Sequence, residues 1–358
     1  MGGAERQLVL LANLMPASQY RVKVICMYNS EPLGSDLNAN VELVTLSKKG
    51  RWDAFIFLYR CYVEIKSFRP DFLYSFLVIP NIISVLMSPF LKRCMIVWGI
   101  RASDMDLTRY DHFTRITYKL CAALSRFAHI RISNSLAGAD HALKTGFSGP
   151  IEFVPNGIDL EKFQPDELRR KATRKILGIE EQTLVMACVA RLDPMKGHPI
   201  LFEALKLLLD DCFEFSFFCV GSGDSEYSKE LRKLSKNYGL ANRIKWFDSY
   251  ERMSDFYISI DLLISSSEFG EGFSNVIVEA MACGTPVVAT RVGDSAHIIG
   301  NENLLCLPSS SEDLKKSILN GLAMVGTDRQ EIRKLVLNYS ASMLLTNTES
   351  AFRQYKPV

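Results

Sequence analysis

Residues 265–290, SSSEFGEGFSNVIVEAMACGTPVVAT, decide how the rest of the chain is interpreted. The run TPVVAT predicts a buried strand, and the stretch before it predicts a helix that Gly284 and Pro286 bring to an end. Such an order of loop, helix and strand is typical of a parallel α/β sheet.

The loop that enters this helix is built from Gly272, Phe273, Ser274 and Asn275, with Ser274 as the expected N-cap. The start of a helix offers free backbone N–H groups and the positive end of the helix dipole. Both favour an anion, so we predict that a diphosphate binds here.

Two glutamates flank the same loop, Glu271 on one side and Glu279 on the other, eight positions apart. Acidic side chains inside a small, apolar segment usually have partners. We therefore expect the two carboxylates to hydrogen-bond hydroxyls of a sugar and of a ribose. The alternative is that both are merely solvated.

Strand-like and helical stretches alternate on both sides of this segment, and 358 residues suffice for two domains. The segment IEFVPNGIDLEKFQP, residues 151–165, breaks the alternation. We predict an α/β fold of two Rossmann-like, doubly wound parallel-sheet domains facing a central cleft. The expected domains are residues 1–155 and 156–335, with a final helix in 336–358 that packs back toward the first domain.

The first domain begins unusually, because Gly2 and Gly3 form a glycine turn into a helix without a preceding strand. Either the true start lies further upstream, or the first sheet folds with a gap that exposes strand edges. A central strand is therefore expected to be missing from this domain.

Composition narrows the class of protein. Hydrophobic residues make up 48% and charged residues 23%, which excludes a disordered chain, and a net charge of +2 gives no support for nucleic-acid binding. Residues 1–155 hold 18 basic and 12 acidic side chains. This excess indicates an anionic partner, such as a phospholipid surface or a phosphate-bearing substrate, or else a chance excess of solvated charges.

Residues 91–131 supply most of that excess, with eight Lys or Arg against three Asp. A helix here is expected either to lie on an anionic membrane or to pack into the domain as an ordinary amphipathic helix. The two possibilities are compatible with each other.

Cysteine usage and the absence of targeting signals predict a cytoplasmic location. The nine cysteines include no CxxC pair, and MGGAER matches neither a signal peptide nor a myristoylation site. The apolar stretch 72–91 is interrupted by Pro80, Asn81 and Pro89, so we expect a strand, a turn and a helix there rather than a membrane span.

Two further loops carry candidate ligands for a nucleotide. In VARLDPMKG, Arg191 and Lys196 follow a strand and precede a helix, where two cations can neutralise a diphosphate. In VGSGD, Gly221 and Gly223 permit close approach of a nucleotide to the backbone. A dinucleotide-binding fingerprint would need a third glycine where this chain has Glu226, so the hypothesis that this loop binds NAD loses its main support.

EGFSNVIVEAMACGTPVVA resembles the nucleotide-sugar signature of glycosyltransferase family 4, retaining enzymes of the GT-B architecture. VPNGIDLEKFQP, VARLDPMKG, VGSGD and GGAERQ resemble other segments of that family in the same order. The resemblance covers nearly the whole chain, and it is far more specific for the family than for the sugar.

The resemblance implies roles for the candidate residues. Arg191 and Lys196 would bind and stabilise the departing diphosphate in place of a metal ion, and Glu271 would hold the sugar. Glu279 would hold the ribose, the amides from Gly272 to Asn275 would bind phosphate or sugar, and the glycine turn would lie beside the nucleotide. The loop near Ser249 and Tyr250 would flank the base. No cofactor and no metal are expected.

On the acceptor or phosphate side we place Gly2, Gly3 and Arg101. Many members of the family carry a histidine near this position, where this chain has Arg101, so the role of that histidine is not transferred to Arg101. The alternative is that Arg101 forms an ion pair with Asp104 or Asp106. Asp104 and Asp106 form a DxD pattern, which binds metal in another transferase architecture, but the pair lies far from the predicted diphosphate site.

The sequence thus predicts a retaining glycosyltransferase that moves a hexosyl or N-acetylhexosaminyl group from a UDP-sugar, or a GDP-sugar, to a glycan or lipid-linked acceptor. Surface polysaccharide biosynthesis is the expected setting, with peripheral association to the inner face of the cell membrane. Two alternatives stay open: a sugar-nucleotide epimerase of the same fold, and a non-catalytic nucleotide-sugar-binding subunit.

Overall fold

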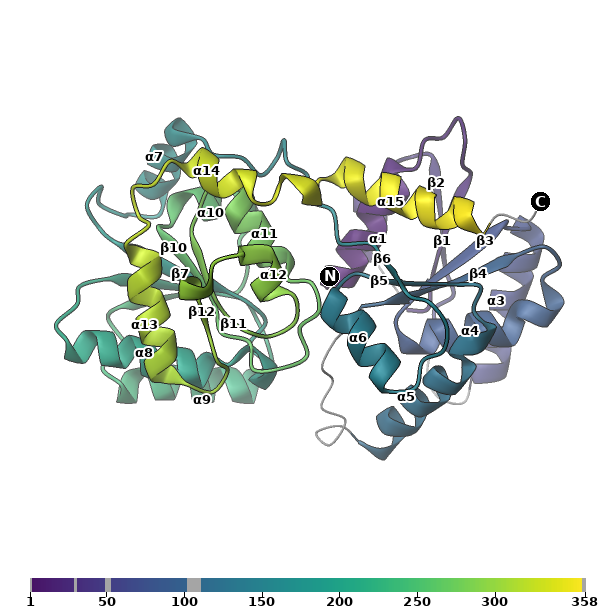
Figure 1. The fold of residues 1–358 in the computed structure, drawn as a ribbon, viewed down its shortest axis with the longest axis horizontal. Helices are drawn as coiled ribbons and strands as arrows, with labels where there is room; N and C mark the ends of the chain where they lie inside the picture. The colour runs from purple at the N-terminus through teal and green to yellow at the C-terminus, as the bar shows by residue number, and fades with distance from the viewer. Residues whose placement is uncertain (1, 29–30, 49–52, 102–110, 356–358) are drawn as a thin grey trace. The chain divides into compact units, whose positions relative to one another are not determined.

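The computed structural model describes residues 2–28, 31–48, 53–101 and 111–355. The chain forms two compact units (Figure 1). Unit 1 comprises Met1–Gly157 together with Ala341–Val358, and unit 2 comprises Ile158–Ser340.

Unit 2 contains one six-stranded parallel sheet with the order β12-β11-β10-β7-β8-β9 (Figure 1). Its strands are β7 (Val185–Val189), β8 (Ser216–Val220), β9 (Ile244–Phe247), β10 (Leu262–Ser265), β11 (Val287–Thr290) and β12 (Leu305–Cys306). Its helices are α7 (Glu167–Ile176), η4 (Pro194–Lys196), α8 (His198–Asp210), α9 (Ser225–Asn237), α10 (Met253–Ser259), α11 (Asn275–Ala282), α12 (Ser295–Ile299), η5 (Glu302–Leu304), α13 (Ser311–Leu322), α14 (Arg329–Lys334) and η6 (Leu337–Tyr339).

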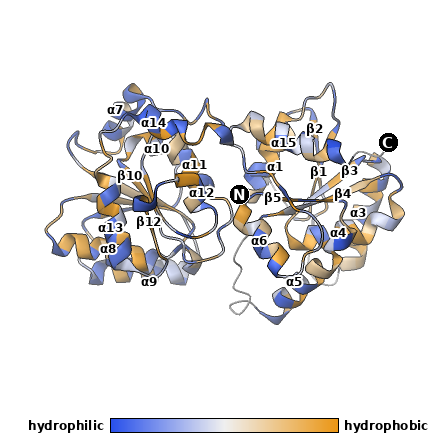
Figure 2. Ribbon diagram, in the orientation of Figure 1, coloured by the Kyte–Doolittle hydropathy of each residue, from blue (hydrophilic) through white to orange (hydrophobic). Residues whose placement is uncertain are grey.

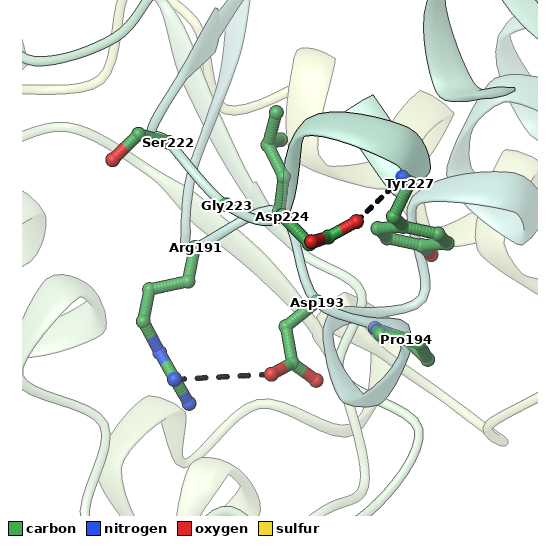
Figure 3. A pocket seen from close by; sticks show the side chains of 8 residues that line it. Arg191, Asp193, Pro194, Ser222, Gly223, Asp224 and Tyr227 are labelled. Carbon is green, nitrogen blue, oxygen red and sulfur yellow. Dashed lines mark hydrogen bonds and ion pairs between the residues drawn. The ribbon is translucent and has the colours of Figure 1, made fainter. Parts of the chain in front are cut away.

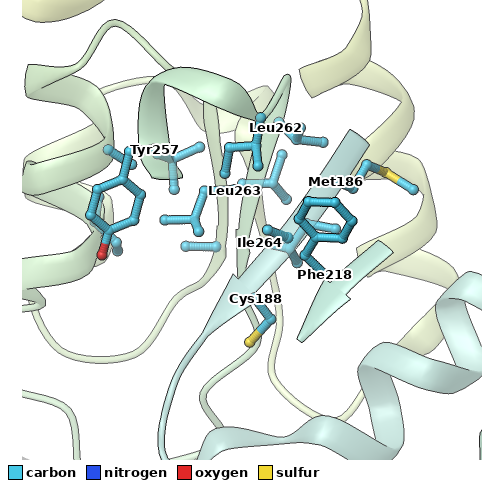
Figure 4. Close-up of a cluster of buried hydrophobic side chains, with 14 of the residues drawn as sticks. Met186, Cys188, Phe218, Tyr257, Leu262, Leu263 and Ile264 are labelled. Carbon is cyan, nitrogen blue, oxygen red and sulfur yellow. The ribbon is translucent and has the colours of Figure 1, made fainter. Parts of the chain in front are cut away.

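The core of unit 2 is formed by apolar side chains of its central strands (Figure 4). Met186 of β7, Phe218 of β8 and Leu263 of β10 are almost completely buried. Strands covered on both faces by helices need apolar residues at consecutive positions, which explains runs such as VMACV and LLIS.

The strand order reverses between β7 and β10, which are neighbours although β8 and β9 lie between them in sequence. From β7 the chain continues to β8 on one side, and β10 begins the other side of the sheet. Loops that leave two such neighbouring strands diverge and open a crevice at the carboxyl ends, where α/β proteins bind ligands.

Unit 1 contains two parallel sheets, β1-β2 and β3-β4-β5-β6 (Figure 1). The strands are β1 (Val22–Cys26), β2 (Val41–Thr45), β3 (Phe72–Phe76), β4 (Met95–Ile100), β5 (Ile130–Ser133) and β6 (Glu152–Phe153). The helices are α1 (Gly3–Leu14), α2 (Glu31–Asp36), α3 (Ala54–Phe68), α4 (Val78–Met87), η1 (Ser88–Phe90), α5 (His112–Leu124), η3 (Ser125–Phe127), α6 (Leu136–Lys144) and α15 (Ala341–Gln354).

The four-stranded sheet of unit 1 has a core on each face. Ile96 and Trp98 of β4 pack with residues of α3, α4 and α5, whereas Val97 packs with residues of α1 and α15. The ring of Phe352 on α15 stacks on Phe72 of β3, with centroids 4.5 Å apart. The last helix is therefore part of the core of unit 1.

The side chain of Gln7 on α1 forms hydrogen bonds with the backbone of Gly157, the last residue of the first segment of unit 1. Its amide nitrogen donates to the carbonyl of Gly157, and its amide oxygen accepts from the Gly157 N–H, each at 2.9 Å. Both groups are buried, so the two hydrogen bonds satisfy polar atoms that water does not reach.

The apolar stretch 72–91 folds as β3, α4 and η1, with Pro80 in the first turn of α4. Among the described residues no helix combines the length and the apolar character that crossing a bilayer requires. The sequence analysis missed β2, whose VELVT segment places a charged residue inside a short strand.

Candidate active site

Two loops meet at the reversal point of the sheet in unit 2. The first follows β7 and contains η4, and the second connects β10 to α11. Ser266 donates a hydrogen bond from Oγ to the carbonyl of Lys196 (2.8 Å), and the Glu268 N–H donates to the carbonyl of Met195 (2.8 Å). These bonds fix the loops against each other.

The same contact brings two predicted catalytic residues together. The Lys196 ammonium forms an ion pair with the Glu271 carboxylate, and Ser267 Oγ donates to that carboxylate at 3.4 Å. The side chains of Lys196 and Glu271 are only 17% and 14% exposed, so solvent screens the pair poorly. A cation and a carboxylate are thus held side by side at the carboxyl ends of the strands.

Gly197 permits the close approach of the two loops. Its φ is +64°, and a Cβ at this position would lie 2.0 Å from the carbonyl oxygen of Ser266. No other residue type fits there without moving a backbone, so the position requires glycine for two independent reasons.

The loop before α11 is held from the other side by Asp294, whose N–H donates to the carbonyl of Gly272 (3.0 Å). Phe273 is 6% exposed and its ring contacts that of Tyr339, with centroids 5.1 Å apart. The Phe273 side chain therefore belongs to the core, and only its backbone is available to a ligand.

Ser274 occupies the N-cap position of α11, but its hydroxyl makes no capping hydrogen bond. Its buried Oγ has no partner among the described residues. Ser274 is thus the N-cap by position, as predicted, but its side chain forms no capping bond, although its backbone (φ −87°, ψ 101°) lies in the β region usual for an N-cap. Asn275, the first residue of α11, is also buried.

Glu279 lies on α11 and is 5% exposed. The Tyr257 hydroxyl on α10 donates a hydrogen bond of 2.9 Å to its carboxylate. The side chain is thus oriented by a buried phenol rather than solvated.

Arg191 follows β7 and lines a pocket of about 350 Å³ (Figure 3). Its side chain is 68% exposed, and its guanidinium lies 3.8 Å from the Asp193 carboxylate. The pocket is lined by Arg191, Leu192, Asp193, Pro194, Ser222, Gly223, Asp224 and Tyr227. This cation remains accessible to an anion, in contrast to the shielded Lys196.

Gly221 and Gly223 follow β8, and Gly223 lines the same pocket. A Cβ at Gly221, which has a φ of +145°, would lie 1.9 Å from the carbonyl oxygen of Ala190, and one at Gly223 would lie 2.0 Å from that of Leu192. Both glycines are therefore required by the contact between the loops after β7 and β8. The sequence analysis attributed them to a nucleotide alone.

His198, the first residue of α8, is a buried titratable group two positions after Lys196. Burial, with a smaller contribution from the positive charge of Lys196, lowers the pKa of His198 to about 4. Neither ring nitrogen has a hydrogen-bond partner among the described residues. The imidazole is consequently neutral at physiological pH.

The predicted acceptor-side residues lie in unit 1. Arg101 directly follows β4, donates to Tyr74 Oη (3.0 Å) and to Asn156 Oδ1 (3.1 Å), and lies over the ring of Phe76. Gly2 is the N-cap of α1, and its N–H donates to the Glu5 carboxylate; Gly3 begins the helix. Asp104 and Asp106 fall outside the described residues.

Within the described ranges, no group of three or more His, Cys, Asp or Glu side chains could hold a metal ion. Tyr250, predicted near the base, packs its ring on Phe247 and Phe256. The sequence analysis missed Ser266, Asp294 and Tyr257, which position the candidate ligands. The run of small residues before Glu268 was the only local pattern that could have indicated Ser266. No local pattern marks Asp294 or Tyr257.

Family models match both halves of the chain. The description "Glycosyl transferases group 1" matches residues 169–334, and "Glycosyltransferase Family 4" matches residues 1–162. Together these two ranges cover most of the chain.

Curated relatives match over shorter regions. A D-inositol 3-phosphate glycosyltransferase of Geodermatophilus obscurus is 34% identical over 149 residues, which are 39% of this chain and 32% of that protein. The lipopolysaccharide core biosynthesis mannosyltransferase LpsB of Rhizobium meliloti is 28% identical over 173 residues, 47% of this chain and 49% of that protein. The matches therefore span about a third to a half of the length of these relatives.

Solved structures match nearly the whole fold. Anabaena Alr3699/HepE in complex with UDP has a TM-score of 0.83 at 22% identity, covering 99% of this chain and 96% of that one. WaaG, a glycosyltransferase involved in lipopolysaccharide biosynthesis, has a TM-score of 0.74 at 18% identity, covering 98% and 95%. With its two parallel-sheet α/β domains of the GT-B type, the chain belongs to the group 1, family 4 glycosyltransferases.

Proposed function

We propose that the protein transfers a sugar from a nucleoside diphosphate sugar, preferably a UDP-sugar, to a glycan or lipid-linked acceptor, with retention at the anomeric carbon. The observation that carries the proposal is the Lys196–Glu271 pair, held at the reversal point of the unit 2 sheet. A cation for phosphate and a carboxylate for sugar hydroxyls are both needed where the bond between sugar and diphosphate breaks.

Each candidate residue has a proposed task. Arg191 and Lys196 bind the diphosphate and offset the negative charge that grows as it departs. Glu271 accepts hydrogen bonds from the sugar, Glu279 accepts them from the ribose, and the amides from Gly272 to Asn275 bind phosphate or sugar. Gly221 and Gly223 keep the backbone beside the nucleotide free of side chains.

The proposed step is balanced without a further reactant. The bond between the anomeric carbon and the diphosphate oxygen breaks, and a bond from the acceptor oxygen to the same carbon forms on the same face. Because the acceptor attacks on the face that the diphosphate leaves, no carboxylate nucleophile is required. The acceptor proton passes to the departing phosphate, so no separate carboxylate base is required either. Arg101, Gly2 and Gly3 in unit 1 are proposed to contact the acceptor or phosphate.

The setting proposed is the cytoplasmic assembly of a surface polysaccharide. All nine cysteines are free thiols, as expected in a reducing compartment. LpsB and WaaG, which resemble this chain, are both described as acting in lipopolysaccharide biosynthesis. The structure of HepE with bound UDP supports UDP as the first nucleotide to test.

The first test is thermal unfolding of the protein alone and with UDP, GDP or NAD. Binding to the folded state raises the midpoint, and a hundredfold excess over the dissociation constant stabilises by about 2.7 kcal/mol. We expect a shift with UDP that weakens in Lys196→Ala. No shift with UDP or GDP, from a protein that unfolds cooperatively, would overturn the proposal.

Product analysis then separates the transferase from its rivals. Sugar appearing on an acceptor supports transfer, free epimerised sugar nucleotide without any acceptor supports an epimerase, and binding without turnover supports a non-catalytic subunit. Lys196→Ala should slow the transfer step itself, so its turnover number should fall. Because cationic side chains are proposed to replace a metal, transfer should persist in EDTA.

A further inference from the structure

Exposed aromatic side chains are unevenly distributed over the chain. Every Phe or Tyr that the structure shows as exposed belongs to unit 1, and each has more than half of its surface in solvent. They are Tyr28, Phe55, Tyr59, Phe90, Phe113 and Phe127. All but the first lie on α3, η1, α5 and η3, and such a concentration of apolar surface marks an interaction site.

Helix α5 has two apolar faces. Tyr118, Cys121 and Ala122 face the core, whereas the stripe of Phe113, Ile116 and Leu120 is 46–66% exposed. The spacing of three and then four residues places this stripe along one side of the helix. An ordinary amphipathic helix would carry polar residues on that outer face.

Helix α3 repeats the arrangement. Phe57, Cys61 and Ile65 are buried, while Phe55 is 88% and Tyr59 68% exposed. Helices α3, α4 and α5 pack on the same face of the four-stranded sheet (Figure 1), and Figure 2 shows apolar and polar residues intermixed along them.

The exposed groups of these helices adjoin one another. The ring of Phe90 in η1 contacts that of Tyr62 on α3, with centroids 5.9 Å apart, and α4, directly before η1, packs against α5. We call the outer side of α3, η1, α5 and η3 the apolar–basic surface.

Basic residues dominate this surface. Residues 54–93 and 111–127 contain eight Lys or Arg and three Asp or Glu. Glu64 pairs with Lys23 at 3.0 Å, and Asp111 accepts a hydrogen bond from the Thr114 N–H at 2.8 Å. Two of the three acids are thus engaged within the domain.

Seven of the eight cations in these ranges are exposed: Arg60, Lys66, Arg69, Lys92, Arg93, Lys119 and Arg126. Arg131, which the sequence analysis counted with them, is instead buried and donates to the carbonyls of Ser125, Ala128 and Pro150. The positive charge of the surface therefore comes from the ends and outer side of the helices.

We propose that the apolar–basic surface docks on an anionic lipid bilayer, with the aromatic and aliphatic side chains in the headgroup layer and the cations against lipid phosphates. Exposed aromatic residues and an excess of exposed cations on the same helices match such a membrane in both chemistry and charge. A second copy of the chain fits poorly, because it would bring the same cations together. The inference does not rest on the proposed transfer reaction.

Sedimentation with vesicles tests the proposal. The full chain is mixed with phosphatidylcholine vesicles, with or without about 30% phosphatidylglycerol, and the bound fraction is measured. We expect binding to the anionic vesicles that weakens at high salt. Phe113→Ser/Ile116→Ser/Leu120→Ser should lower the partition coefficient about tenfold or more, and Lys119→Gln/Arg126→Gln should lower it severalfold.

Matched controls come from unit 2. Leu168 and Ile176 on α7 are 82% and 69% exposed and lie on a basic helix, so Leu168→Ser/Ile176→Ser should leave binding unchanged. Circular dichroism melting checks that the triple variant folds. The proposal would be overturned if the folded triple variant bound vesicles as well as the parent chain, or if the parent chain did not bind anionic vesicles. It would also be overturned if the parent chain were a dimer and the triple variant a monomer. Lys196→Ala should bind vesicles normally, which keeps a failure of this inference distinct from a failure of the proposed function.

Discussion

Lys196 and Glu271, 75 positions apart in sequence, form an ion pair in the candidate site. The proposed diphosphate must therefore compete with a resident carboxylate for the ammonium group. Such a pair holds the lysine in position before the substrate arrives, and it also weakens the attraction of the site for free nucleoside diphosphate.

Replacing Glu271 with Gln should separate these two effects. The variant keeps a similar shape but leaves the Lys196 charge without its partner, so we expect UDP to bind about five- to tenfold more tightly, on the order of 1 kcal/mol. Transfer should nevertheless slow, because a neutral amide holds sugar hydroxyls less well. Titration calorimetry with UDP measures the first effect, and unchanged or weaker UDP binding would contradict it.

The acid dependence of stability should reveal His198. Its folded-state pKa of about 4 is lower than its usual value of 6.5, so between these limits the unfolded chain binds a proton that the folded chain does not. The stability is complete above pH 6.5, and about 3 kcal/mol should be lost as the pH falls to 4. Urea unfolding of the parent and of His198→Leu at several pH values measures the difference in the slope of unfolding free energy against pH. The exposed His297→Leu serves as control, and an identical slope for His198→Leu would refute the assignment.

Close contact at Gly197 should make this position sensitive to a single methyl group. Gly197→Ala places a Cβ against the Ser266 carbonyl and should destabilise the protein by about 2–4 kcal/mol. Gly178 has nearly the same φ, +65°, but no atom within 4 Å of the added Cβ. Gly178→Ala should therefore cost only about 1 kcal/mol. If urea unfolding showed equal losses of unfolding free energy for the two variants, the contact between the loops would contribute nothing to stability.

Thiol reactivity should distinguish Cys212 from the other cysteines. Cys212 is exposed and Cys26 is half-buried, whereas the other seven cysteines are buried, and burial raises the pKa of Cys61 to about 11 and that of Cys188 to about 12. A thiol reagent at pH 8 should label one site rapidly in the native protein and all nine after denaturation. Cys212→Ser should remove the rapid phase. Several rapid sites in this variant would contradict the burial of the rest.

The sequence predicted the class of fold because buried parallel strands need continuous apolar runs, and unit 2 has them in VMACV, SFFCV and LLIS. It did not identify β2, since a five-residue strand with an acid at its second position resembles a loop. Local patterns report burial and turns but carry no information on which strands become neighbours.

The candidate site was predictable only in part for the same reason. Lys196 and Glu271 stand out through their motifs, whereas Ser266 and Asp294 act through contacts with the backbone of other loops. The glycines after β8 could not be interpreted from the sequence alone. A close contact between two loops requires glycine, and so does the close approach of a ligand to the backbone, and the sequence does not distinguish these two causes. Ser274 shows that a favourable N-cap residue need not form the capping hydrogen bond.

The division of unit 1 into two segments has a consequence for biosynthesis. Unit 2 is continuous in sequence, so the whole of it is synthesised before α15. Unit 1 starts first but finishes last, because its core lacks Phe352 and Leu344 until α15 emerges. The nascent first segment therefore has to wait, with part of its apolar surface uncovered, for about the time needed to translate the whole of unit 2.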